Sequence, residues 1–321
     1  MDESLVTVHV PLPARDRHVA VFYLHGGGLL YGERDDLPAP YVQALVDAGY
    51  TLVCADYPLC PEATLGDLFD SLAATWRAEI ADRVASEEFT GYFLFGRSAG
   101  AYLSLMLARH IHALGAEAPQ PLGILDFYGY YSLLDQAFYE PAAAYTALPG
   151  VSREQVARIA GDPSAMVTSG PKPLRYSLYV YARQNAGAWL ELMGLNASEE
   201  TEGAGNAGSA SPAESSTAVS LPATSSPASP SSAASLPAVS SPATWSLSDE
   251  DIAALPPLFI TASSGDEDVP MRISKTLMRK APSAKPAWVY YLPHDFDRDT
   301  SNPAGMEVYR KALAWMDGLL A

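Results

Sequence analysis

The stretch that decides the fold runs from Gly91 to Ile111 and reads GYFLFGRSAGAYLSLMLARHI. The run Tyr92–Phe95 is apolar, as in a buried strand, and the residues after the central serine have the composition of a helix. Between them, the pattern G-x-S-x-G places Ser98 between Gly96 and Gly100. A serine in a sharp turn between strand and helix presents its hydroxyl at the top of a sheet. The context therefore predicts that Ser98 is a nucleophile, and a serine in an ordinary glycine-rich turn is the alternative.

Strand-like and helix-like runs alternate along most of the chain. The alternation predicts an α/β fold with a mostly parallel central sheet and helices on both faces. A short polar loop joins the first two strand-like runs, so we expect that pair to be antiparallel. The strand-like runs are Leu5–Val10, Val19–Leu24, Thr51–Ala55, Tyr92–Phe95, Leu122–Phe127, Leu258–Ala262 and Trp288–Leu292. The helix-like runs are Ala39–Ala48, Leu65–Ile80, Ala99–Ala113, Pro270–Lys280 and Pro303–Leu320.

Composition limits the possible partners. The 321 residues carry a net charge of −17, which argues against binding to nucleic acid or to an anionic membrane surface. The apolar runs are too short to span a bilayer, and the acidic N-terminus does not resemble a signal peptide. We therefore expect a cytoplasmic protein. Two cysteines, Cys54 and Cys60, do not make a disulfide framework.

The middle of the chain departs from the alternating pattern. Residues 196–249 are rich in Ala, Ser and Pro, which gives them little apolar surface to bury, so we predict a disordered insertion. Residues 130–195 contain helix-like segments that do not fit the sheet rhythm, and we predict a helical cap over the carboxyl edge of the sheet. Residues 1–129 and 250–321 then form the core.

A second glycine-rich motif follows a strand. The segment YLHGGGLLYG places three glycines directly after the run Val19–Leu24. Acyl transfer needs N–H donors for a developing oxyanion, and glycines let backbone amides point inward. We predict that Gly27, Gly28 and Ala99 supply these donors, and that His25 is structural. A phosphate-binding loop is the alternative, but neither G-x-G-x-x-G nor Lys-Ser/Thr is present there.

Together the two motifs resemble those of a known family. H-G-G-G followed by G-x-S-A-G looks like the α/β-hydrolase fold, and specifically the hormone-sensitive-lipase-like esterases. The segment ADYPLCPEATLGDLFDSL is similar to that family's D-Y-R-L-A-P-E segment. The resemblance covers about 19–128 and 256–321, and it implies a helical cap inserted after the sixth strand. The matching residues of the third segment are Asp56, Tyr57, Leu59, Pro61 and Glu62.

The resemblance implies a chain order of serine, acid and histidine. Only His294 lies well after Ser98 and beyond a late acid, in the loop PHDFDRD. It would take the serine proton and pass it to the leaving group. A surface-loop histidine is the alternative.

The acid is expected in SSGDEDVP, after the run Leu258–Ala262, where Asp266, Glu267 and Asp268 are the candidates. We predict Asp266, because it comes first and because D-x-x-V-P resembles the family's acid segment. Asp268 is the alternative acid, although it is better suited to capping the helix that Pro270 opens.

One residue of the elbow departs from the family. Arg97 stands where these esterases have an acidic residue. It could favour anionic substrates, but we expect it to pair with a local carboxylate.

The predicted function is a serine hydrolase that cleaves small carboxylic esters through Ser98, His294, Asp266 and an acyl-enzyme. An amidase, peptidase or lipase with the same triad is one alternative, and a non-catalytic binding protein on the hydrolase scaffold is another. No metal or organic cofactor is predicted. The acyl and alcohol groups and the oligomeric state stay open.

Overall fold

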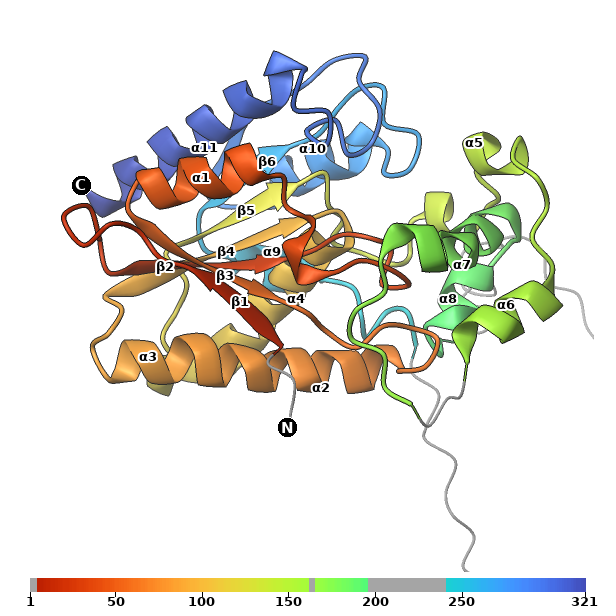
Figure 1. Cartoon of the computed structure of the whole chain (residues 1–321), viewed down its shortest axis with the longest axis horizontal. Coiled ribbons are helices and arrows are strands. Elements are labelled where there is room, and N and C mark those ends of the chain that lie inside the picture. The colour runs from red at the N-terminus through yellow and green to blue at the C-terminus, as the bar shows by residue number, and fades with distance from the viewer. Residues whose placement is uncertain (1–4, 162–164, 196–240) are drawn as a thin grey trace, which may run out of the picture.

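A seven-stranded sheet forms the centre of the molecule (Figure 1). The structure, a computed structural model, describes residues 5–161, 165–195 and 241–321. The strand order is β1-β3-β2-β4-β5-β6-β7, and every pair except β1–β3 is parallel. The predicted α/β class is thus confirmed. The strands are β1 (Val6–His9), β2 (Val19–Leu24), β3 (Tyr50–Ala55), β4 (Gly91–Arg97), β5 (Gly123–Phe127), β6 (Leu258–Thr261) and β7 (Ala284–Pro286).

Helices cover both faces of the sheet. The side chains on both faces of the central strands are buried as a result. Alternate residues of β2 belong to two separate cores: Phe22 packs with residues of α2, α4 and α10, and Tyr23 packs with residues of α1 and α11. The helices are α1 (Ala39–Asp47), α2 (Leu65–Trp76), α3 (Asp82–Ala85), α4 (Ala99–Ala113), α5 (Ala143–Thr146), α6 (Arg153–Ala160), α7 (Lys172–Gln184), α8 (Ala188–Leu192), α9 (Asp249–Ala253), α10 (Met271–Lys280) and α11 (Pro303–Leu320).

The first strand pairs differently from the prediction. β1 is antiparallel, but its neighbour is β3 and not β2, with Val6 opposite Ala55 and His9 opposite Leu52. Both edges of β2 are already occupied by the parallel strands β3 and β4. The outer edge of β3 is therefore the one that β1 can join.

The strand predicted at Trp288–Leu292 is wrong. β7 ends at Pro286, and beyond it only Val289 forms a bridge, to Ser263. Tyr291 has a left-handed backbone (φ +62°), and its N–H donates to the Ser264 side chain instead of to a strand ladder. Tyr290 and Tyr291 are therefore exposed beyond the end of the sheet, because a left-handed residue ends the extended conformation.

The helices α5 to α8 lie together beyond one end of the sheet (Figure 1). They follow β5, the fifth strand of the chain. The predicted position after the sixth strand is therefore wrong, because only five strands come before these helices.

Part of the predicted disordered insertion is packed. Residues 196–240 lie outside the described residues, but 241–249 do not. The N–H of Leu247 donates to the Tyr131 carbonyl at 2.8 Å, and the buried Ser246 hydroxyl accepts from the N–H of Leu133 at 2.8 Å. The predicted end of the disordered insertion at residue 249 is therefore wrong. Residues after 244 include apolar side chains, such as Leu247, that pack against the folded core.

The glycines of the elbow allow a close contact between α4 and the end of β2. A Cβ added to Gly100 would lie 2.0 Å from the Leu24 carbonyl oxygen, whereas one added to Gly318 in α11 would meet nothing within 4 Å. We expect Gly100→Ala to lower the free energy of unfolding by about 2–3 kcal/mol through overpacking. Gly318→Ala, its matched control, should raise it by up to about 1 kcal/mol because alanine favours a helix. Urea unfolding measures both, and an unchanged midpoint in Gly100→Ala would contradict this contact.

Candidate active site

Ser98 occupies a strained turn between β4 and α4. Its backbone is left-handed at φ +53° and ψ −118°, which is uncommon for a residue with a side chain. The N–H of Ser98 donates to the carbonyl of Phe127, the last residue of β5, at 2.8 Å, and this bond stabilises the turn. β2 is the other neighbour of β4, with Leu24 opposite Gly96. The H-G-G-G motif, which follows β2, therefore lies beside Ser98.

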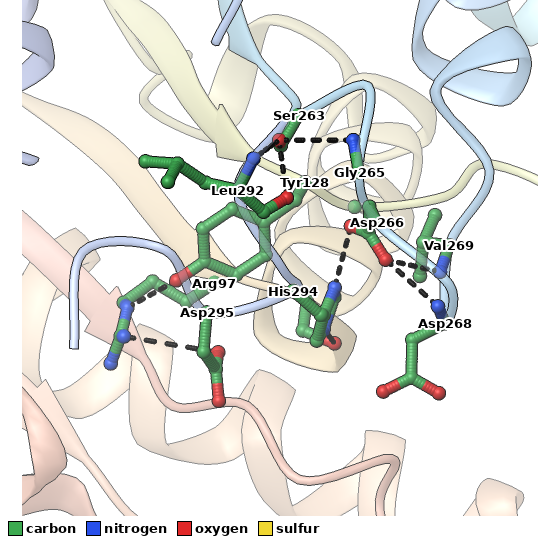
Figure 2. A network of polar contacts seen from close by, with 12 residues as sticks. Arg97, Tyr128, Ser263, Gly265, Asp266, Asp268, Val269, Leu292, His294 and Asp295 are labelled. Atoms are coloured by element: carbon green, nitrogen blue, oxygen red, sulfur yellow. Dashed lines mark hydrogen bonds and ion pairs between the residues drawn. The ribbon is translucent and has the colours of Figure 1, made fainter. Parts of the chain in front are cut away.

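His294 joins the serine to a carboxylate. Its Nε2 lies 2.8 Å from the Ser98 Oγ, and its Nδ1 lies 2.7 Å from the Asp266 Oδ2. The other oxygen of Asp266 accepts the N–H groups of Asp268 and Val269, each at 2.9 Å (Figure 2). Because both oxygens are engaged, the fully buried carboxylate is fixed in orientation toward the imidazole. The structure thus brings together the three residues that the sequence singled out.

Asp268 has a different environment. Its carboxylate accepts the hydroxyls of Tyr145, at 2.6 Å, and Tyr179, at 3.2 Å. No side chain caps α10, whose N-cap is Pro270. The capping role expected for Asp268 is therefore wrong, because its carboxylate faces the tyrosines of α5 and α7.

Carboxylates set the proton affinity of His294. Burial by itself would lower the pKa of His294, but Asp266, helped by Asp268 and Asp295, raises it to about 10. The ring of Tyr128 packs edge-on against the imidazole at 4.9 Å between centroids. This environment favours the imidazolium, so the neutral form that can accept the serine proton predominates only at alkaline pH.

The predicted oxyanion donors belong to the glycine loop after β2 and to the first residue of α4. Gly27 and Gly28 have left-handed backbones, with φ of +107° and +61°. Across the described part of the chain, no hydrogen bond uses the N–H of Gly27, Gly28 or Ala99. Ala99 opens α4, where a backbone N–H has no partner within the helix. The carbonyl of Gly28 accepts the indole N–H of Trp189 at 2.8 Å, which fixes the loop and leaves its amides available.

His25 supports the glycine loop. It is fully buried, its Nδ1 lies 2.7 Å from the Gly26 carbonyl oxygen, and its ring stacks on Tyr57 at 4.2 Å. Burial lowers its pKa to about 4, so the ring is neutral. These contacts agree with the structural role expected for it.

A cavity of about 970 Å³ opens beside His294. The sequence did not identify its lining, because the residues come from loops and helices with no motif of their own. The tyrosines Tyr31, Tyr145, Tyr176 and Tyr291 and the ring of Phe296 line it together with four carboxylates and two cations. The charged lining residues are Glu267, Asp268, Asp295, Asp299, Lys172 and Arg298.

The described ranges hold neither a cluster of metal ligands nor a helix suited to a membrane. Within 5–161, 165–195 and 241–321, no three His, Cys, Asp or Glu side chains are grouped as a metal site. In the same ranges, no helix has both the length and the apolar character needed to cross a membrane.

The sequence and the fold match those of proteins with the α/β-hydrolase fold. A family model described as the α/β-hydrolase fold matches residues 21–169. The non-reducing polyketide synthase adrD of Penicillium rubens is 32% identical over 133 residues, which are 38% of this chain and 5% of that protein. The chain thus matches only a small part of its curated relatives' length.

Solved structures match over nearly the whole chain. An α/β-hydrolase superfamily protein from Enterococcus faecalis is 28% identical with a TM-score of 0.71, covering 97% of this chain and 94% of that one. A bacterial esterase of the hormone-sensitive lipase family, 15% identical with a TM-score of 0.56 over 99% of this chain and 86% of that one, shares the fold. This chain therefore has the α/β-hydrolase fold.

Proposed function

We propose that this protein is a serine carboxylesterase that cleaves small esters through an acyl-enzyme. The observation that carries the proposal is the hydrogen-bonded row from Ser98 through His294 to Asp266, with distances of 2.8 and 2.7 Å. A nucleophile, a base and a group that orients the base are what acyl transfer requires.

The first half-reaction begins at the serine hydroxyl. Ser98 Oγ attacks the ester carbonyl while His294 Nε2 accepts its proton, and Asp266 stabilises the resulting imidazolium. The oxyanion accepts hydrogen bonds from the amides of Gly27, Gly28 and Ala99, whose N–H groups have no other partner among the described residues. His294 then returns the proton to the departing alcohol, which leaves an acyl-enzyme.

Water completes the cycle. It attacks the acyl-enzyme with His294 again as base, and the carboxylic acid leaves as Ser98 recovers its proton. We propose that residues 130–195 cover the site as a cap on a core of 1–129 and 250–321. The tyrosine-lined cavity beside His294 would take the alcohol or the acyl group. The cytoplasmic location stays a prediction from the sequence.

The test is a series of p-nitrophenyl esters from acetate to palmitate, with an anilide of the preferred acyl group. We expect turnover to be highest on short chains, because polar and charged residues interrupt the cavity wall, and a fluorophosphonate probe to label Ser98. Highest turnover on long chains would indicate a lipase, and faster cleavage of the anilide an amidase. No turnover and no labelling would overturn the proposal in favour of a binding protein.

A further inference from the structure

The residue next to the nucleophile is a buried cation. Arg97 is 1% exposed, and its guanidinium lies 2.9 Å from Asp297, 3.3 Å from Asp36 and 3.8 Å from Asp295. Its Nε donates to the Tyr128 hydroxyl at 2.7 Å (Figure 2). The expected pairing with a local carboxylate is therefore observed. We call these five residues the Arg97 cluster.

The partners of Arg97 come from the segments that carry the rest of the site. Asp36 lies in a short 3₁₀ turn, Arg34–Asp36, which follows the glycine loop. Tyr128 follows β5 and packs against the His294 ring. Asp295 and Asp297 belong to the loop of His294 itself. One guanidinium thus connects the segment of the nucleophile with those of the base and the oxyanion donors.

Asp297 anchors the histidine loop through several bonds. It is completely buried, and it accepts the Tyr128 hydroxyl at 2.7 Å and the Tyr309 hydroxyl of α11 at 3.0 Å in addition to Arg97. Replacing a buried ion pair by apolar residues often costs no stability, so a gain in stability does not explain this arrangement. What the cluster fixes is geometry, because a fully bonded carboxylate three residues after His294 restricts where that loop can lie.

We propose that Arg97 is a positioning residue, which holds the loop of His294 so that Nε2 stays within hydrogen-bonding distance of the Ser98 Oγ. The inference rests on the proposed hydrolase function. A misplacement of about 1 Å in a catalytic group can cost about 100-fold in rate. Loss of the guanidinium should therefore lower kcat far more than it changes KM.

The same guanidinium also acts on the charge beside the base. Burial would raise the pKa of Asp295, but Arg97 and then His294 lower it, so Asp295 is ionised next to the imidazole. Without Arg97 the attraction of Asp295 for the imidazolium is no longer offset, and we expect the pKa of His294 to rise further. The side chains that contact His294 are Asp266, Ser98 and Tyr128. The other titratable groups that line the cavity beside it are Glu267, Asp268, Asp299, Lys172, Arg298, Tyr31, Tyr145, Tyr176 and Tyr291.

The test compares Arg97→Met and Arg97→Lys in the full-length protein. We expect Arg97→Met to lower kcat by about 100-fold with KM within about threefold, and to move the acid limb of the kcat/KM profile to higher pH. Arg97→Lys keeps the positive charge, but an ammonium cannot make all the hydrogen bonds of the planar guanidinium. Its kcat should therefore lie between those of the wild type and Arg97→Met, and the acid limb of its kcat/KM profile should stay at the wild-type pH. The matched control is Arg34→Met, which removes a guanidinium from the buried Asp56 and reaches none of the three site residues; it should keep wild-type kcat and profile.

Two readouts separate this proposal from the proposed function. NMR titration of the His294 ring needs no substrate, so it reports the effect of Arg97 even if no ester is cleaved. Wild-type kcat and an unmoved His294 titration in folded Arg97→Met would overturn the positioning role. If that variant does not fold, Arg97→Lys and Asp297→Asn decide the matter, and wild-type kcat in either folded protein would overturn it.

Discussion

Ser98→Ala should lower kcat on p-nitrophenyl acetate by about 10⁶-fold, because the variant loses the nucleophile that the base activates. The oxyanion donors and the binding cavity stay in place, so a residual rate about 10³–10⁴ above that of water is expected. KM should change little where binding precedes chemistry. Initial rates under saturating ester, with active-site titration of the wild type, measure the loss.

The matched control is Ser104→Ala in α4, the helix that follows Ser98. Ser104 is fully buried, and its hydroxyl donates to the Gly100 carbonyl at 2.9 Å. Its replacement should leave kcat unchanged. A folded Ser98→Ala protein with more than a hundredth of wild-type kcat would show that another group attacks the ester.

The parts of the fold that the sequence predicts well are those encoded by short-range patterns. The helix predicted at Ala99–Ala113 begins and ends at those residues in the structure. β2 and β6 are continuous apolar runs, and such runs indicate burial on both faces. Two glycine-rich motifs that each follow a parallel strand must meet at one edge of the sheet, which made the main features of the site predictable.

The two wrong strand predictions concern segments whose conformation depends on residues far away in the sequence. The run Trp288–Leu292 has the composition of a strand, but its backbone is diverted by a bond to Ser264 from the loop after β6. β1 was assigned the wrong neighbour because its position depends on which edges the parallel strands leave free. Local pattern carries no information about either choice.

The Arg97 cluster shows the same limit within the site. The sequence indicated that Arg97 pairs with a carboxylate, but not which one: its closest carboxylate, Asp297, is 200 residues away. Asp36 and Tyr128 approach from two further segments. Such a cluster forms only when the whole sheet is assembled, so no motif marks it.

The choice between the two acids near β6 gives the second large expected effect. Asp266→Asn should lower kcat by about 10⁴-fold, because an amide cannot stabilise the imidazolium and favours the wrong histidine tautomer. Its geometry should survive, since the amide oxygen can still accept the N–H groups of Asp268 and Val269. The comparison variant is Asp268→Asn, which removes a charge two residues away.

Asp268→Asn should keep kcat within about tenfold of the wild type, because its carboxylate binds Tyr145 and Tyr179 and does not contact the imidazole. Its charge does contribute to raising the pKa of His294. We therefore expect the acid limb of kcat/KM to move to lower pH in this variant. Kinetics of both proteins from pH 6 to 11 would separate the two roles. A larger loss of kcat in Asp268→Asn than in Asp266→Asn would assign the acid to Asp268, and would mean that its tyrosine contacts are exchanged for His294 when substrate binds.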